Sequence, residues 1–182
     1  MNILFLGYNK QETTLIDFLV SRNHDVNNSS NRFDDLSGYD LVISFGYRYI
    51  FKEYQLQTLN RPIINLHISY LPFNRGSHPN FWAHYKKTKS GVSIHEIDNG
   101  IDTGPIIFRK EVIFLNLKMS LKDSYNHLKM EIEKLFIENI DLIESRKYKV
   151  ISEDEIGTYP VSYTHLRAHE TRGNLVCRLL LE

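Results

Sequence analysis

The sequence predicts an α/β fold in which a mostly parallel, twisted sheet carries helices on both faces. Three short runs rich in apolar, β-forming residues have the length of buried strands: 2–7 (NILFLG), 39–46 (YDLVISFG) and 61–69 (RPIINLHIS). Helical patterns alternate with such runs along the chain. Because short apolar strands that alternate with helices form parallel sheets covered on both sides, this order indicates the fold class.

The first half of the chain supplies the parallel strands in order. After the strand at 2–7, residues 10–22 place apolar side chains at helical spacing and predict a helix. Residues 23–37 are polar and predict a weak strand followed by a loop. The strand at 39–46 ends in glycine, as does the first. The strand at 61–69 has proline near its start, where a strand tolerates that residue.

The second half predicts a sheet edge and a long helix. Residues 91–98 (GVSIHEID) alternate with period two, and residues 105–112 (PIIFRKEV) form a second such run, so we expect a hairpin-like pair at an edge of the sheet. The longest helix is expected over Ser120–Ser145, packed back over the sheet. Its apolar stripe consists of Leu121, Tyr125, Leu128, Ile132, Leu135, Ile140 and Ile143.

The composition indicates which kinds of molecule the protein binds. The chain has 182 residues, 42% hydrophobic and 24% charged, with a formal net charge of zero. A balanced charge gives no electrostatic reason to bind nucleic acid or an acidic membrane surface, which leaves a small polar substrate as the expected partner. No apolar run approaches the roughly 20 residues that cross a bilayer. The N-terminus has no basic segment before its apolar run, so we expect a cytoplasmic protein.

Residues 161–182 differ in kind from the rest. Val161–Thr171 and Asn174–Leu181 resemble, codon by codon, a translated adapter used in preparing sequencing libraries, and a short amphipathic helix is the alternative. We therefore expect one domain over residues 1–150, the start of a truncated C-terminal segment over 151–160, and a non-native tail. Three residues of the tail are excluded as site candidates: His165, His169 and Cys177.

Polar residues gather where the third strand ends. Asn65 and His67 are two apart on a strand, so their side chains point to the same face. Ligands of parallel sheets bind beyond the carboxyl ends of the strands. There an amide N–H can stabilise an oxyanion and an imidazole can move a proton. Two polar residues that cap a turn are the alternative.

A second motif follows about thirty residues later. In 98–106 (DNGIDTGPI), glycines at 100 and 104 indicate a tight loop that brings Asp102 close to a partner. A carboxylate beside an imidazole raises the imidazole pKa and fixes the orientation of the ring. An ordinary turn aspartate is the alternative. No metal site is predicted, because His78 and His84 do not share a helix face.

Together, 65–76 (NLHISYLPFNRG) and 98–106 resemble the paired signature of the 10-formyltetrahydrofolate-dependent formyltransferases. The resemblance covers residues 2–150 and implies a Rossmann-like catalytic domain with 10-formyltetrahydrofolate as cosubstrate. It also implies that Asn65 and His67 stabilise a tetrahedral oxyanion, while Asp102 orients His67 and helps to remove the amine proton.

The resemblance also implies the binding regions. The folate pocket is expected at Tyr47, Arg48, Tyr49, Ile50, Asp98, Gly100 and Gly104. Residues 75–82 (RGSHPNFW) resemble the branch that acts on nucleotide sugars. There Arg75 would meet a pyrophosphate and Asn80 or Trp82 would line the sugar pocket. Core packing is the alternative for the aromatic pair in this segment.

The expected reaction is transfer of a formyl group to the amine of a nucleotide-linked amino-dideoxy sugar, for example dTDP-4-amino-4,6-dideoxyglucose, in lipopolysaccharide O-antigen biosynthesis. A homodimer is left open. Glycinamide ribonucleotide transformylase is one alternative, although 5–13 (FLGYNKQET) has a single glycine where that enzyme has a Gly-X-Gly-Ser-Asn phosphate loop. Three further alternatives remain. The first is methionyl-tRNA formyltransferase, the second is a hydrolase that releases formate from the cofactor, and the third is an inactive fragment that binds folate or nucleotide.

Overall fold

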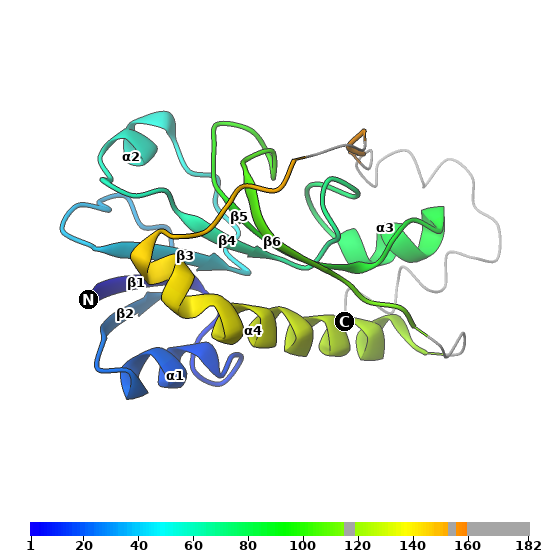
Figure 1. Ribbon diagram of the computed structural model, residues 1–182, viewed down its shortest axis with the longest axis horizontal. Helices are drawn as coiled ribbons and strands as arrows, with labels where there is room; N and C mark the ends of the chain where they lie inside the picture. Colours follow the sequence, from blue (N-terminus) through cyan, green and yellow to red (C-terminus); the bar gives the residue numbers. More distant parts are fainter. Residues whose placement is uncertain (115–118, 153–155, 160–182) are drawn as a thin grey trace.

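The computed structural model describes residues 1–114, 119–152 and 156–159 (Figure 1). The strands of this part are β1 (Asn2–Gly7), β2 (Asp25–Ser29), β3 (Leu41–Phe45), β4 (Ile64–His67), β5 (Gly91–Glu96) and β6 (Ile106–Glu111). The helices are α1 (Leu15–Ser21), α2 (Glu53–Gln57), α3 (Pro79–Lys86) and α4 (Leu121–Ser145). The expected adapter-like tail lies outside the described residues.

The strands form one sheet with the order β2-β1-β3-β4-β5-β6. The pairs from β2 to β4 are parallel, whereas β5 is antiparallel to β4 and β6 is antiparallel to β5. This arrangement confirms the predicted α/β class, the weak strand at β2 and the hairpin-like pair at the sheet edge. The change of direction at β4 places a strand end of the parallel part beside an antiparallel neighbour.

Both faces of the sheet are covered, because β1 alternates its side chains between two apolar clusters. Ile3 and Phe5 belong to the cluster that α1 and α4 cover, and both helices lie on the same side of the sheet in Figure 1. Leu4 and Leu6 belong to the opposite cluster, against which Leu56 of α2 packs. The sheet is thus sandwiched between helices, as its nearly continuous apolar strands indicate.

The helix α4 confirms the predicted amphipathic pattern. Its N-cap is Ser120, whose side-chain oxygen accepts a hydrogen bond from the Asp123 backbone N–H at 3.0 Å. The apolar side chains that it buries are Leu128, Ile132, Leu135, Phe136, Ile140 and Ile143. None of the helices within the described ranges is long and apolar enough to cross a membrane.

Two elements are shorter than expected, and local hydrogen bonds explain both. The helix expected over 10–22 begins only at Leu15, because Asn9 closes a turn in which its side-chain oxygen accepts from the Gln11 N–H at 2.8 Å. The strand expected over 61–69 covers only β4. Directly after it the chain turns, and the Ser69 hydroxyl donates to the Phe73 carbonyl at 2.7 Å. The sequence pattern does not indicate α2.

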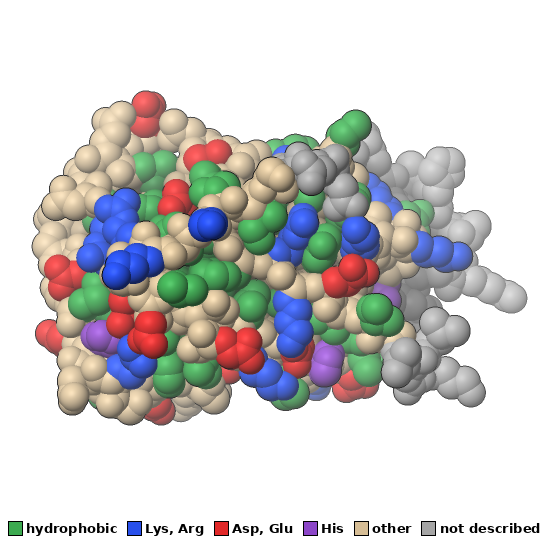
Figure 2. All heavy atoms as spheres, in the orientation of Figure 1, with side chains coloured by type: hydrophobic (Ala, Val, Ile, Leu, Met, Phe, Trp, Pro, Cys, Tyr) green, Lys and Arg blue, Asp and Glu red, His purple; other side chains and the backbone are tan. Residues whose placement is uncertain are grey.

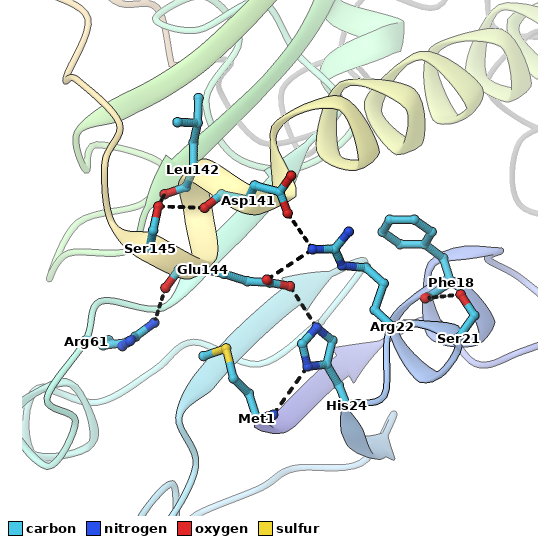
Figure 3. Close-up of polar contacts among 10 residues, drawn as sticks. All are labelled: Met1, Phe18, Ser21, Arg22, His24, Arg61, Asp141, Leu142, Glu144 and Ser145. Carbon is cyan, nitrogen blue, oxygen red and sulfur yellow. Dashed lines mark hydrogen bonds and ion pairs between the residues drawn. The ribbon is translucent and has the colours of Figure 1, made fainter.

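A charged network ties the end of α4 to the first strand (Figure 3). Glu144 accepts from His24 Nε2 at 2.8 Å and from Arg22 Nη2 at 3.3 Å, and its backbone carbonyl accepts from Arg61 Nη1 at 2.8 Å. The amino group of Met1 lies 3.3 Å from the other ring nitrogen of His24. The Glu144 side chain is 18% exposed, and the two partners of its carboxylate, Arg22 and His24, lie in the connection between α1 and β2.

We predict that Glu144→Ala lowers the free energy of unfolding by about 1–2 kcal/mol, because it removes the carboxylate that accepts hydrogen bonds from the partly buried Arg22 and His24 side chains. Asp141→Ala is the matched control, since Asp141 also pairs with Arg22 but its side chain is 82% exposed. The control is expected to change stability by less than about 0.5 kcal/mol. Urea denaturation measures both, and equal losses would contradict the assigned role of Glu144.

Candidate active site

Four polar residues meet beside the end of β4, and we call them the polar cluster: Asn65, His67, His95 and Asp102. Asn65 and His67 are two apart on β4 and share one face, while Leu66 between them points into the cluster covered by α4. His95 lies on β5 directly opposite Asn65 in the strand register. The loop that leads from β5 to β6 carries Asp102. The predicted grouping of Asn65, His67 and Asp102 is therefore present in the structure.

Asp102 is the centre of the polar cluster. Its Oδ2 accepts from the Gly76 backbone N–H at 2.8 Å and lies 3.6 Å from His67 Nε2. Its Oδ1 lies 3.4 Å from His95 Nε2 and accepts from Asn65 Nδ2 at 3.3 Å. The carboxylate is 14% exposed. One buried charge is thus surrounded by two imidazoles and two N–H donors, as a buried charge requires.

The loop 98–104 is shaped so that it presents Asp102. Asp98 Oδ1 accepts from the Gly100 N–H at 2.9 Å and from the Thr103 hydroxyl at 2.6 Å, which closes the turn. Gly104 packs so closely that an added Cβ would lie 1.9 Å from the Glu96 carbonyl oxygen. Asp102 itself has a φ of 51°, a left-handed conformation that aspartate tolerates better than most residues. Asp98 and the glycines therefore build the loop.

The electrostatics favour a charged Asp102 beside a neutral His67. Burial raises the pKa of the Asp102 carboxyl, but the electrostatic interaction with the His67 ring, the contact with His95 and the Gly76 N–H outweigh it and hold that pKa well below its usual range. Burial is also the main influence on His67, and it lowers the pKa of the imidazole despite the opposing attraction of Asp102. The site thus combines a carboxylate with an uncharged imidazole.

The two ring nitrogens of His67 differ in their hydrogen bonding. A hydrogen bond with the Asn74 backbone favours its protonated form. Its Nε2 is buried and has no hydrogen-bond partner within the described residues. This nitrogen also lies near Asp102 Oδ2, which would stabilise a proton there. The geometry therefore provides a position at which a proton can be taken up and held.

The residues expected at the folate pocket come from two segments. Tyr47 follows β3, accepts from the Phe33 N–H at 3.0 Å, and contacts the Tyr49 ring at 5.3 Å between centroids. Arg48, Tyr49 and Ile50 are exposed. Tyr47 and Ile97, the residue before the second segment, pack on the same apolar cluster. The structure thus brings the loop after β3 and the loop 98–104 to one face of the sheet.

The residues expected at the sugar divide into two groups. Arg75 is partly exposed and directly precedes Gly76, whose N–H holds Asp102, so it flanks the polar cluster. Asn80 is only 7% exposed, and its Nδ2 donates to the Leu121 carbonyl at 3.0 Å and to Ser124 Oγ at 3.1 Å.

Trp82 is also buried, at 5% exposed, and packs edge-on against Phe81 at 5.2 Å between ring centroids. Asn80 therefore joins α3 to α4, and the core-packing alternative describes Trp82. The structure brings neither residue to the polar cluster, and the expectation that they line a sugar pocket stays a prediction.

His95 is the member of the polar cluster that the sequence reasoning missed as a site residue. The sequence shows it only as one position of a period-two strand, for which a hydrogen-bonded or solvent histidine is the ordinary interpretation. Its place opposite Asn65 depends on the register between β4 and β5. The sequence pattern does not determine that register.

Comparison with known proteins relates this chain to one protein family. The family model described as formyl transferase matches residues 9–140. A dTDP-4-amino-4,6-dideoxyglucose formyltransferase of Mycobacterium tuberculosis is 35% identical over 111 residues, which are 60% of this chain and 46% of that protein. A methionyl-tRNA formyltransferase of Thermodesulfovibrio yellowstonii is 36% identical over 104 residues, 57% of this chain and 33% of that protein. The chain thus spans less than half the length of these two relatives.

A solved structure covers more of both chains. The formyltransferase PseJ from Anoxybacillus kamchatkensis, in complex with UDP-4,6-dideoxy-4-formamido-L-AltNAc and tetrahydrofolate, superposes with a TM-score of 0.81 at 38% identity. The match covers 88% of this chain and 85% of PseJ. Because the family model extends over well more than half of the sequence, the chain belongs to the formyl transferase family.

Proposed function

We propose that this chain transfers the formyl group of 10-formyltetrahydrofolate to the primary amine of a nucleotide-linked 4-amino-4,6-dideoxy sugar. The observation that carries the proposal is the polar cluster, in which an amide, an uncharged imidazole and a carboxylate meet at a strand end of a formyl transferase domain. Two similar proteins, PseJ and the mycobacterial dTDP-4-amino-4,6-dideoxyglucose formyltransferase, are both named for formyl transfer or 4-formamido sugars.

The proposed reaction gives a role to three residues of the polar cluster: Asn65, His67 and Asp102. The sugar amine attacks the formyl carbon, and the carbonyl oxygen becomes an oxyanion to which Asn65 Nδ2 donates a hydrogen bond. His67 Nε2 takes the proton that the amine loses, and Asp102 stabilises the resulting imidazolium. The carbon–N10 bond then breaks, N10 receives the proton from His67, and tetrahydrofolate leaves.

The proposed folate site lies between the loop after β3 and the loop 98–104. Tyr49 and Ile50 are 44% and 76% exposed, so large apolar surface is available beside the backbone of both loops. Asp98, Gly100 and Gly104 act by fixing the loop path. We assign Arg75 to the pyrophosphate of the sugar nucleotide, because it flanks the cluster and carries a planar charge suited to phosphate oxygens.

Methionyl-tRNA formyltransferase is the second candidate function. It is favoured by the similarity of this chain to the Thermodesulfovibrio yellowstonii enzyme over 104 residues. The charge pattern argues against it. A protein that holds tRNA needs a field of positive charge, yet the chain has a formal net charge of zero. On the face in Figure 2, lysine and arginine side chains are interspersed with acidic ones. A small, charged sugar nucleotide therefore fits this surface better than tRNA.

The function is tested by measuring tetrahydrofolate release from 10-formyltetrahydrofolate with a panel of acceptors. We expect release with dTDP-4-amino-4,6-dideoxyglucose or with a UDP-linked 4-amino-4,6-dideoxy sugar, and the preferred nucleotide follows from the ratio of kcat/KM. Methionyl-tRNA is expected to give only the background of the reaction without acceptor. Release without acceptor would indicate a hydrolase, and no release with any acceptor would indicate an inactive fragment; both results contradict the proposal.

We predict that His67→Asn lowers kcat by about 100-fold or more, because the variant has no group that takes up the amine proton. The matched control is His84→Asn in α3, whose ring contacts Ser124 rather than the polar cluster. The control is expected to keep kcat within about threefold. A His67→Asn variant that is folded, by circular dichroism, and as active as the wild type would refute the assigned proton transfer.

We predict that the Asp102 carboxyl stays ionised at pH 4, where an ordinary aspartate is about half protonated. Because the folded pKa lies below the unfolded one, the charge contributes stability above about pH 4 that is lost as the pH falls toward the folded pKa. The carboxyl ¹³C resonance, assigned by its absence in Asp102→Asn, reports the ionisation directly. A resonance that titrates at or above pH 4 would show that the imidazoles and the Gly76 N–H do not outweigh burial.

A further inference from the structure

His95 holds the amide of Asn65 through a hydrogen bond whose direction the geometry defines. The His95 side chain is 1% exposed. Its Nδ1 lies 2.7 Å from the Glu96 carbonyl oxygen, which can only accept, so Nδ1 carries a proton. Its Nε2 lies 2.9 Å from Asn65 Nδ2, which can only donate. Nε2 therefore accepts from the Asn65 amide, while Nδ1 donates to the Glu96 carbonyl.

This hydrogen bond determines whether the nitrogen or the oxygen of the Asn65 amide points toward the reacting carbonyl. One proton of Asn65 Nδ2 is fixed on His95, and the other points toward Asp102 Oδ1 over a longer distance of 3.3 Å. The second proton is thus weakly held and can turn to an oxyanion that forms nearby. Without an acceptor at position 95, nothing on β5 distinguishes the nitrogen of the amide from its oxygen.

We propose that His95 is a positioning residue, which keeps the nitrogen end of the Asn65 amide toward the reacting carbonyl by accepting one of its two protons. The inference rests on the proposed formyl transfer and assigns His95 no contact with substrate. Loss of the acceptor leaves the longer 3.3 Å contact with Asp102 Oδ1 as the hydrogen bond of the polar cluster that orients the amide, so the amide turns over more readily. In the turned amide the oxygen faces the oxyanion and repels the charge that the nitrogen would stabilise.

The same hydrogen bond also gives His67 and His95 different relations to Asp102. His67 Nε2 and His95 Nε2 lie 3.6 Å and 3.4 Å from the oxygens of Asp102, and their ring centroids are 6.1 Å apart. One buried carboxylate compensates one cation, and two neighbouring imidazolium ions repel each other. Because the Asn65 N–H occupies the acceptor nitrogen of His95, Asp102 is left to stabilise the proton on His67.

The kinetic test compares His95→Leu with His95→Gln. Leucine fills the buried volume but accepts no hydrogen bond, so we expect kcat to fall by about 10- to 100-fold while KM for 10-formyltetrahydrofolate changes by less than about threefold. Glutamine offers a side-chain oxygen as acceptor and is expected to restore kcat to within about fivefold of wild type. Thermal unfolding of both variants shows whether each is folded.

A merely structural role would lower stability and kcat similarly in the two variants. A His95→Leu variant with wild-type kcat, or a folded His95→Gln variant as slow as His95→Leu, would overturn the proposal.

A second measurement needs no activity. Long-range ¹H–¹⁵N NMR of the wild-type protein at pH 7, with His95 assigned by the His95→Gln variant, shows which ring nitrogen carries the proton. We expect the proton on Nδ1 alone, and we expect the Asn65 side-chain amide resonances to move in His95→Leu. A proton on Nε2, or unchanged Asn65 resonances, would overturn the positioning role.

The two readouts separate this inference from the proposed function. If no acceptor gives formyl transfer while NMR shows the Nδ1 proton and shifted Asn65 resonances, the proposed function fails and His95 still orients the amide. If transfer occurs and His95 carries its proton on Nε2, the proposed function stands and the positioning role fails.

Discussion

The buried carboxylate of Asp102 is the constraint on which the rest of the site depends. A charge at this depth is tolerated only with several partners, and here they come from β4, β5 and the loop that contains Gly76. Each segment must therefore be in place for the others to be stable. The Asn65 amide and the His67 imidazole beside this charge are also the groups that the proposed formyl transfer uses, so the same contacts support both the fold of this region and its proposed chemistry.

The sheet provides this arrangement because its direction changes at β4. A parallel neighbour would have placed a βα crossover beside His67, whereas the antiparallel β5 brings His95 directly opposite Asn65. The short hairpin-like connection from β5 to β6 then carries Asp102 back over the face that presents both side chains. On the other face, Leu66 packs under α4. The alternation of side chains along β4 thus places Asn65 and His67 on the face of the candidate site and Leu66 in the core.

Side chains alternate between the two faces of a strand, and this alone predicts that Asn65 and His67 share a face. Two glycines are sufficient to predict the loop that presents Asp102. The sequence does not predict the partners that depend on pairing between elements. The register of β5 places His95 opposite Asn65, and the amide of Asn80 meets the first turn of α4. Local patterns predict which way a side chain points, and they do not predict what another element places there.

The segment 156–159 extends the site's support beyond the region that the family signature covers. Thr158 pairs with the loop after β4: its N–H donates to the Pro72 carbonyl at 3.0 Å, and its carbonyl accepts from the Arg75 N–H at 3.0 Å. Its hydroxyl oxygen accepts from the Asn74 N–H at 2.8 Å. This loop ends in Gly76, whose N–H holds Asp102. Residues near 158 therefore fix, through the backbone, the position of a donor to the Asp102 carboxylate, and the contacts that define the candidate site continue past residue 150.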